Sequence, residues 1–279
     1  MQPSPGWPAP AKINLMLRIV GRRADGYHLL QTVFQFIDLG DDLFVDVRED
    51  GVIRRCSEIA GVCEDDDLVV RAARLLQRAT GTALGADLRL QKRIPMGAGL
   101  GGGSSDAATT LVALNHLWGC HLPAGDLASL GLQLGADVPI FVHGHAAWAE
   151  GVGEHLVDID LAEPWYVLLA PRVHVNTGKV FQDPELTRNS DRITIRDFLA
   201  GERINDCLAV VRKRYPEVAH AYDWLSEFAP AQLTGTGACV FAETADRDSA
   251  EDLLRRLPSG MDGYVVRGVN RSPLLDGPR

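Results

Sequence analysis

The sequence predicts an α+β fold with two lobes, in which mostly antiparallel sheets carry helices packed on one side and a cleft lies between the lobes. Its 279 residues exceed the usual length of one domain, which favours two packed lobes. Apolar and polar residues alternate from position 12 to 20, the period of a half-buried strand. Apolar residues recur at helical spacing from 68 to 79. Strands and packed helices therefore share the chain.

Strands dominate the first part of the N-terminal lobe. The first strand places the side chains of Lys12 and Asn14 on one face. Asp25-Gly26 is a turn signal, and a further alternating strand covers 43–47 after a break at Gly40-Asp41-Asp42. We expect these strands to pair in antiparallel fashion.

Helices follow in the rest of this lobe. The helix at 68–79 has aspartates in front of it and Gly81 behind it, which are start and stop signals. A strand at 88–90 leads into a glycine-rich loop, and an apolar helical stripe at 107–118 follows that loop. The loop is therefore expected between a strand and a helix.

Asp137 is predicted to lie in a short, stiff connection between a helix at 127–134 and a strand. Gly135 ends the helix, and Pro139 is expected to push Val138 into an extended conformation. The connection would then hold the Asp137 carboxylate in place.

The boundary between the lobes is predicted within 158–164, where a polar, proline-containing stretch precedes a strand at 165–170. Residues 1–160 would form the N-terminal lobe and residues 161–279 the C-terminal lobe. The C-terminal lobe is expected to hold two helices, a hairpin, a further helix and a last strand, at 205–214, 217–228, 235–237, 250–257 and from 264.

Composition and charge limit the classes of partner. The formal net charge is −9, and Lys and Arg form no run long enough to follow a nucleic-acid backbone or an anionic membrane surface. No apolar stretch reaches the roughly 18 residues that span a bilayer, and the first residues lack the pattern of a secretory signal. The five cysteines are scattered and form no metal or redox motif. We therefore expect a cytoplasmic protein with no nucleic-acid and no membrane partner.

The glycine-rich segment is the most specific chemical signal. It runs Pro95-Met96-Gly97-Ala98-Gly99-Leu100-Gly101-Gly102-Gly103-Ser104-Ser105. Glycines let backbone N–H groups approach phosphate oxygens, and the N-terminus of the following helix adds about half a positive charge. Ser104 and Ser105 can cap the helix or contact phosphate and a hydrated Mg²⁺. The segment therefore predicts a phosphate site; a mobile loop with a serine cap is the plainer alternative.

The same glycines partly match the motifs of two other nucleotide-binding folds. Gly97-x-Gly99-x-x-Gly102 satisfies the dinucleotide fingerprint. However, the preceding strand is amphipathic, the unit lies in the middle of the chain, and no acidic residue ends a second strand about 20 residues further on. A P-loop is excluded because no Lys follows the glycines.

Three segments resemble, in order and spacing, the three motifs of the GHMP small-molecule kinases. They are Pro10-Ala11-Lys12-Ile13-Asn14-Leu15, Pro95 to Asp106, and Leu233-Thr234-Gly235-Thr236-Gly237-Ala238. The resemblance covers nearly the whole chain. It implies a GHMP-kinase-like fold, with an ATP-binding lobe at 1–160 and a substrate-binding lobe at 161–279, and an ATP-dependent transfer of phosphate to an alcohol.

Further segments are similar to one branch of this family, whose acceptor is a cytidine diphosphate-linked polyol of non-mevalonate isoprenoid synthesis. They are Arg23-Ala24-Asp25-Gly26-Tyr27-His28, Gly135-Ala136-Asp137-Val138-Pro139 and Asn205-Asp206-Cys207. Compared with the general pattern of the family, the loop has extra glycines between Leu100 and Ser104, and this feature is also similar to the branch.

The resemblance implies a role for each matching residue. Asp137 would be the base for the substrate hydroxyl, Lys12 its charged partner, and the segment 95–105 would bind ATP. Tyr27 and Phe181 would sandwich the cytosine ring, His28 would hydrogen-bond its edge, and Asn14 would contact the polyol end.

ATP is expected as co-substrate together with Mg²⁺. No paired carboxylates flank the glycine loop in the sequence, so no protein metal site is predicted, and Mg²⁺ is expected on the nucleotide phosphates, water and a Ser hydroxyl. The partners would be these small molecules, and the protein a monomer or a weak homodimer. Two alternatives stay open: another GHMP kinase with a different alcohol, and a nucleotide-binding regulator without turnover.

Overall fold

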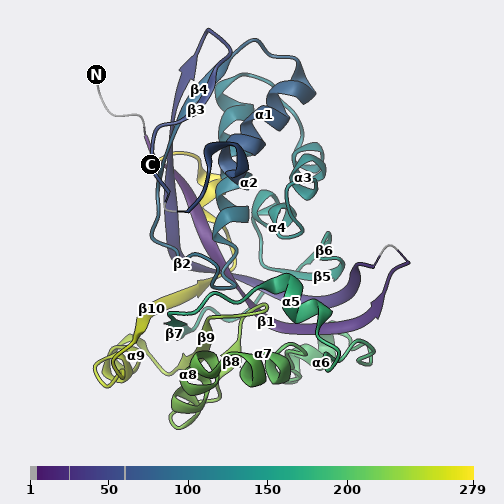
Figure 1. Ribbon diagram of the computed structural model, residues 1–279, viewed down its shortest axis with the longest axis vertical. Coiled ribbons are helices and arrows are strands. Elements are labelled where there is room, and N and C mark those ends of the chain that lie inside the picture. Colours follow the sequence, from purple (N-terminus) through teal and green to yellow (C-terminus); the bar gives the residue numbers. More distant parts are fainter. Residues whose placement is uncertain (1–4, 25, 60) are drawn as a thin grey trace.

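Two long antiparallel strands, β1 (Trp7–Arg22) and β2 (His28–Arg48), join the two halves of the molecule in the computed structural model. The structure describes residues 5–24, 26–59 and 61–279. Figure 1 shows both strands extending between the lower and the upper half. The turn predicted at Asp25-Gly26 lies partly outside the described residues, because Asp25 is not among them.

Strand β2 organises the sheet because it pairs with several partners along its length. These are β1, β5 (Ala147–Gly151), β10 (Met261–Val269) and β4 (Gly85–Gln91), all antiparallel. The short β3 (Ile53–Arg55) is parallel to β4, and β6 (His155–Asp158) pairs with β5. In the lower half, β10 continues the sheet to β7 (Trp165–Pro171), β9 (Val240–Thr244) and β8 (Gln232–Leu233). The predicted mostly antiparallel arrangement is confirmed.

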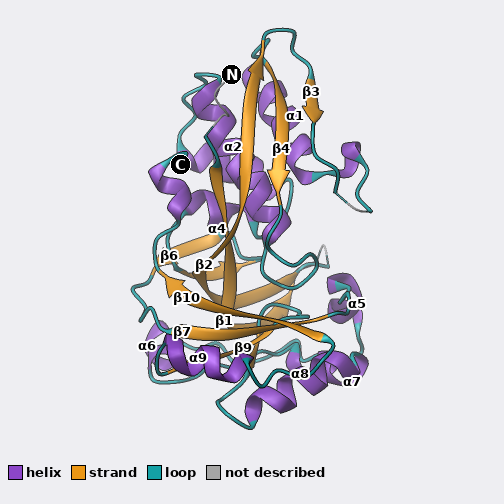
Figure 2. Cartoon of the chain, turned by 90° about the vertical axis from the view of Figure 1, so that its left-hand side faces the viewer, coloured by secondary structure: helices purple, strands orange, loops and turns teal. Residues whose placement is uncertain are grey.

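Helices cover the upper and the lower parts of the sheet separately (Figures 1 and 2). The upper group consists of α1 (Leu68–Thr80), α2 (Gly102–Leu117), α3 (Ala124–Leu132) and α4 (Val138–His143), with the short 3₁₀ helices η1 (Glu64–Asp66) and η2 (Pro273–Asp276) nearby. The lower group consists of α5 (Thr177–Gln182), α6 (Ile195–Leu199), α7 (Leu208–Arg214), α8 (Pro216–Ser226) and α9 (Arg247–Leu254). The α+β class is confirmed. No helix in the described ranges has the length and apolar character needed to cross a bilayer.

A central hydrophobic cluster lies where the two halves meet, between the core of the upper helices and the core of the lower helices. It joins residues of β1, β7 and β9 to Ala98 and Leu100 of the glycine loop, which are 6% and 1% exposed. Burial of these two side chains fixes the loop to the sheet. The loop therefore sits at the junction of the two halves.

Helix α1 confirms the start and stop signals in the sequence. The side chain of Asp67 accepts a hydrogen bond from the Val69 N–H at 2.9 Å and caps the N-terminus. Gly81 ends the helix with a φ of 68°, the left-handed conformation that favours glycine.

The break predicted at Gly40-Asp41-Asp42 is wrong, because β2 runs through it without interruption. The register with β1 shifts there: Pro10 lies opposite Gly40, but Ala11 lies opposite Ile37. A Cβ on Gly40 would lie 3.0 Å from the carbonyl oxygen of Ala9. The glycine therefore permits a bulge and a close strand contact, not the end of a strand.

The lobe division at 160 and 161 stays a prediction. Strand β6 ends at Asp158 and β7 begins at Trp165, so the connection falls in the expected stretch. The last residues nevertheless return to the upper half. Leu274 belongs to the upper core, and the backbones of Gly6 and Arg279 exchange two hydrogen bonds of 3.1 and 2.8 Å.

Candidate active site

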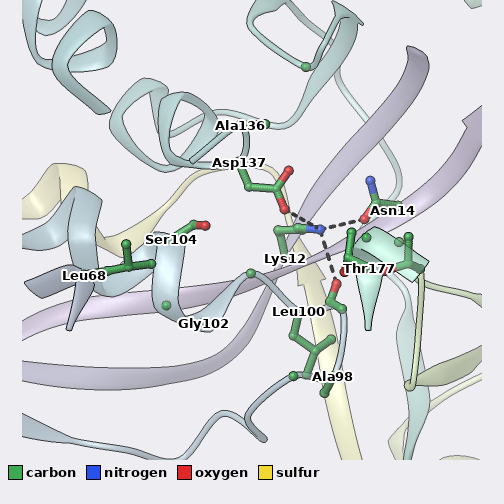
Figure 3. A pocket seen from close by; sticks show the side chains of 18 of the residues that line it. Lys12, Asn14, Leu68, Ala98, Leu100, Gly102, Ser104, Ala136, Asp137 and Thr177 are labelled. Atoms are coloured by element: carbon green, nitrogen blue, oxygen red, sulfur yellow. Dashed lines mark hydrogen bonds and ion pairs between the residues drawn. The ribbon is translucent and has the colours of Figure 1, made fainter. Parts of the chain in front are cut away.

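A cavity of about 1010 Å³ lies between the two halves. It is lined by β1, by the glycine loop and start of α2, by the residues before α4, by α5, and by the turn between β8 and β9. Figure 3 shows part of this lining. These segments lie far apart in the sequence.

Lys12 stands at the centre of the cavity wall (Figure 3). Its side chain is 3% exposed, and its ammonium donates hydrogen bonds to Asn14 Oδ1 at 2.7 Å and to the Gly99 carbonyl at 3.2 Å. It also forms an ion pair with Asp137 Oδ2 at 3.1 Å. A buried ammonium is tolerated only with such partners. Lys12 thus ties β1, the glycine loop and the start of α4 together.

Asp137 is held at the N-terminal end of α4, where it occupies the N-cap position. The prediction that Pro139 forces Val138 into an extended conformation is wrong, because Val138 is the first residue of this helix. Pro fits the first helical turn, since the N–H that it lacks has no intrahelical partner there. The Asp137 side chain is 36% exposed and lines the cavity, so its carboxylate is open to a substrate.

Asn14 is engaged by its neighbours on β2 and on the β8–β9 turn. Its Nδ2 donates to Thr32 Oγ1 at 2.8 Å, and its backbone N–H donates to Thr234 Oγ1 at 3.0 Å. Its Oδ1 accepts from Lys12 at 2.7 Å and lies 3.5 Å from the Thr234 hydroxyl, so the second N–H of its Nδ2 is the group left for a ligand. Its predicted contact with the polyol is thus chemically feasible.

The glycine loop is anchored through its carbonyl groups. The Lys12 N–H donates to Leu100 O at 3.1 Å, the Cys239 N–H donates to Ala98 O at 3.0 Å, and Thr234 Oγ1 donates to Gly99 O at 3.2 Å. All three motifs of the resemblance therefore meet at this loop.

Two glycines of the loop are required by its path. Gly99 and Gly101 have φ values of 77° and 72°. A Cβ on Gly99 would lie 2.5 Å from the Thr234 carbonyl oxygen, and one on Gly101 would lie 2.7 Å from the Phe141 ring. The loop thus alternates tight turns at glycines with the buried side chains of Ala98 and Leu100.

The N-terminus of α2 opens on the cavity, since Gly102, Gly103 and Ser104 line it. The first N–H groups of a helix lack intrahelical partners and favour anions. Pro95 and Met96 also line the cavity. Ser105 does not: its side chain is fully buried, and no hydrogen-bond partner of its hydroxyl is found in the described residues. The phosphate contacts of Ser104 and Ser105 stay predictions, and of the two side chains only Ser104 lines the cavity.

A buried charge cluster that sequence reasoning missed lies beside this helix start. Lys92 Nζ lies 2.7 Å from Asp106 Oδ2 and also pairs with Asp41, and both Lys92 and Asp106 line the cavity. Burial raises the pKa of Asp106 to about 7, against the opposing effect of Lys92. Burial disfavours the charged form of Lys92, but the two carboxylates raise the pKa of this lysine overall. Two carboxylates thus share one ammonium.

Tyr27, His28 and Phe181 line the same cavity, and Phe181 belongs to α5. The His28 ring is stacked on the Phe181 ring, with centroids 5.1 Å apart and an angle of 23° between the planes. Tyr27 is 63% exposed. The structure therefore gathers the predicted aromatic residues from both halves of the chain.

Other residues of the site carried no signal in the sequence. Thr177 Oγ1 lies 2.8 Å from Thr236 Oγ1 and joins α5 to the β8–β9 turn. Thr32 supports Asn14 from the neighbouring strand. Such contacts depend on strand register and tertiary packing, which residue spacing along the chain does not encode.

Two family profiles match the chain. Residues 67–145 match "GHMP kinases N terminal domain", and residues 186–263 match "GHMP kinases C terminal".

Full-length relatives and solved structures agree with these matches. The chain is 54% identical to 4-diphosphocytidyl-2-C-methyl-D-erythritol kinase of Shewanella woodyi, over 98% of this chain and 96% of that protein. It is 56% identical to the protein of the same name from Ectopseudomonas mendocina, over 96% and 92% of the two chains. A crystal structure of 4-(cytidine 5'-diphospho)-2C-methyl-D-erythritol kinase superposes with a TM-score of 0.80 at 32% identity, covering 94% of this chain and 98% of that one. A mevalonate kinase at 16% identity shares the fold, with a TM-score of 0.71 over 96% and 100%.

Proposed function

The chain belongs to the GHMP kinase family and is an ATP-dependent small-molecule kinase, and we propose that it phosphorylates a hydroxyl of 4-diphosphocytidyl-2-C-methyl-D-erythritol with Asp137 as the base. The reaction belongs to non-mevalonate isoprenoid precursor biosynthesis. The observation that carries the site assignment is the Lys12–Asp137 pair, 3.1 Å apart, in the cavity that the glycine loop also lines.

The cavity has one end for phosphate and one end for a base. The loop 95–104 and the start of α2 offer backbone N–H groups to the ATP phosphates. Tyr27 and Phe181 hold the cytosine ring from two sides, and His28 hydrogen-bonds the edge of that ring. Asn14, beside Lys12, contacts the methylerythritol portion. The acceptor hydroxyl then lies between the two ends, near Asp137.

Phosphoryl transfer depends mainly on alignment and charge neutralisation, because the protein forms no covalent bond to the phosphate. Asp137 accepts the hydroxyl proton with the carboxylate that is open to the cavity. The buried Lys12 ammonium fixes the direction of that carboxylate and offsets negative charge that develops on the transferring group.

A divalent cation bound to the nucleotide fits the donors near the glycine loop. The Ser104 hydroxyl lines the cavity, and Asp106 Oδ1 has no hydrogen-bond partner among the described residues. The described residues contain no group of three His, Cys, Asp or Glu side chains that could hold a metal. Mg²⁺ supplies charge neutralisation on the ATP phosphates. The Ser104 hydroxyl would contact its hydration shell.

The acceptor is tested by incubating the wild-type protein with Mg-ATP and the cytidine-linked methylerythritol, and analysing the product by mass spectrometry and ³¹P NMR. Mevalonate and homoserine serve as competing acceptors. A phosphomonoester on the cytidine compound supports the proposal. Transfer to another alcohol identifies a different member of the family, and ATP binding without any transfer identifies a regulator. The cytoplasmic location and the monomeric or weakly dimeric state stay predictions.

A further inference from the structure

Arg188 lies beside the residues proposed to bind the base, and it forms hydrogen bonds to His28 and to the backbone of Phe181. Its Nε donates to His28 Nε2 at 3.3 Å. Its Nη2 donates to the Phe181 carbonyl at 3.0 Å and to the Asp183 carbonyl at 2.6 Å. Arg188 itself does not line the cavity. Its guanidinium therefore connects the His28 ring to the segment that carries Phe181 without touching a ligand.

This geometry fixes which nitrogen of His28 carries the proton. Because Arg188 Nε–H donates to Nε2, that nitrogen must be an acceptor, and in the neutral imidazole the proton then lies on Nδ1. Burial, and then the nearby positive charges of Arg188 and Arg22, lower the pKa of His28 and favour the neutral ring. His28 is thus prepared as a donor through Nδ1.

We infer that Arg188 is a positioning residue that holds His28 in the Nδ1–H tautomer and thereby sets the preference of the site for cytosine over uracil. The inference rests on the proposed function and names the origin of its base specificity. Both bases present an acceptor at O2, but only cytosine presents one at N3, so a His28 Nδ1–H that is directed at N3 can donate to cytosine alone. Uracil carries a proton on N3, which would face the Nδ1 proton and leave a buried donor unpaired.

The guanidinium also fixes the place of the ring. Its planar fork holds the carbonyl groups that follow α5, including that of Leu186 at 3.1 Å, while the His28 ring stacks on Phe181. Without the Arg188 guanidinium, the His28 ring can move and can change its tautomer. The Nε2–H tautomer has an acceptor at Nδ1, which can accept the N3 proton of uracil. A lysine keeps the charge but cannot reproduce the planar set of donors.

The test compares wild type with Arg188→Met, Arg188→Lys and the matched control Arg192→Met. Arg192 lies in the same connection, but its guanidinium pairs with Glu150 at 3.2 Å. The ratio of kcat/KM for the cytidine compound to that for its uridine analogue should fall about tenfold or more in Arg188→Met and less in Arg188→Lys. This fall should come from a higher KM for the cytidine compound, and KM for ATP should not change. The control should keep the wild-type ratio.

A spectroscopic measurement tests the inference without any turnover. Long-range ¹H–¹⁵N NMR of the His28 ring should show the Nδ1–H tautomer in the wild-type protein and the appearance of the Nε2–H tautomer in Arg188→Met. If Arg188→Met does not fold, Arg188→Lys provides the same comparison. A wild-type ring in the Nε2–H form, or an unaltered tautomer and selectivity in folded Arg188 variants, would overturn the inference. A wild-type enzyme that ignores the cytidine compound but shows the Arg188-dependent tautomer would instead refute the proposed acceptor.

Discussion

Lys12 Nζ and Asp137 Oδ2 lie 3.1 Å apart, but the two side chains differ sharply in their access to the cavity. The lysine side chain is 3% exposed and the aspartate side chain is 36% exposed. The ammonium is thus a fixed charge held by Asn14 and the Gly99 carbonyl, whereas the carboxylate can still meet a substrate. This asymmetry suits a positioned base with a fixed, buried cation beside it.

Replacing Lys12 with Met should reduce kcat by about 10²- to 10³-fold, because the charge that offsets the developing negative charge is removed. Asp137 remains partly solvated, so the protein should stay folded. The measurement is steady-state turnover together with thermal unfolding. Lys213→Met is the matched control, since Lys213 pairs with Glu185 on the surface. Turnover within about tenfold of wild type in a folded Lys12→Met protein would remove Lys12 from the mechanism.

Replacing Gly102 with Val should weaken ATP binding, because a side chain at this position enters the helix start that opens on the cavity. Its Cβ would lie 3.1 Å from Ile94 and 3.4 Å from Lys92 Nζ. Titration calorimetry with ATP measures the effect. Gly125→Val is the control, because Gly125 also lies in a first helical turn but a Cβ there meets nothing within 4 Å. Unaltered ATP affinity in a folded Gly102→Val protein would argue against phosphate binding at α2.

Tyr27→Ala and Phe181→Ala should each raise KM for the cytidine substrate about tenfold or more, since stacking on a base is worth roughly 1 to 3 kcal/mol. KM for ATP should not change, because in the proposed arrangement the two rings hold only the cytidine substrate. Phe228→Ala removes an aromatic ring of the lower half that packs on Trp224 and serves as control. If both site variants keep the wild-type KM, the cytosine ring does not bind between these residues.

Asp106→Asn should make stability less dependent on pH. Burial raises the pKa of Asp106 to about 7, above the unfolded value of about 4, so the folded state holds a proton that the unfolded state has released between these values. The contribution of this group therefore falls as pH rises from about 4 to about 7. Relative to wild type, the variant should gain several degrees in Tm at pH 8 and little at pH 4. An equal Tm difference at both values would contradict the raised pKa, and the exposed Asp65→Asn is the control.

Local sequence signals predicted the elements that hold the site. Alternation along β1 placed Lys12 and Asn14 on one face, and the structure joins them by a 2.7 Å hydrogen bond. The glycines and the following helix start predicted the phosphate loop because both signals depend on adjacent residues. The GHMP kinase resemblance is confirmed by the family matches and by relatives above 50% identity.

Features that depend on tertiary context could not be predicted in the same way. Gly40-Asp41-Asp42 was expected to break the strand, but Gly40 permits a bulge against β1. Pro139 was expected to hold Val138 extended, but both residues lie in the first turn of α4. Ser104 and Ser105 are neighbours in sequence, yet the helical rotation between them points only Ser104 toward the cavity. Arg188 and His28 are 160 positions apart in the sequence, and no local pattern marks such a contact.

The most direct test of the account is a coupled ADP-release assay with Mg-ATP and the cytidine-linked methylerythritol, run on the wild-type protein and on Asp137→Asn. The account predicts ADP release by the wild type only when this alcohol is present. It also predicts that Asp137→Asn lowers kcat by about 10²- to 10⁴-fold while binding of both substrates changes little. No acceptor-dependent ADP release by the wild type, or near wild-type kcat in folded Asp137→Asn, would contradict it.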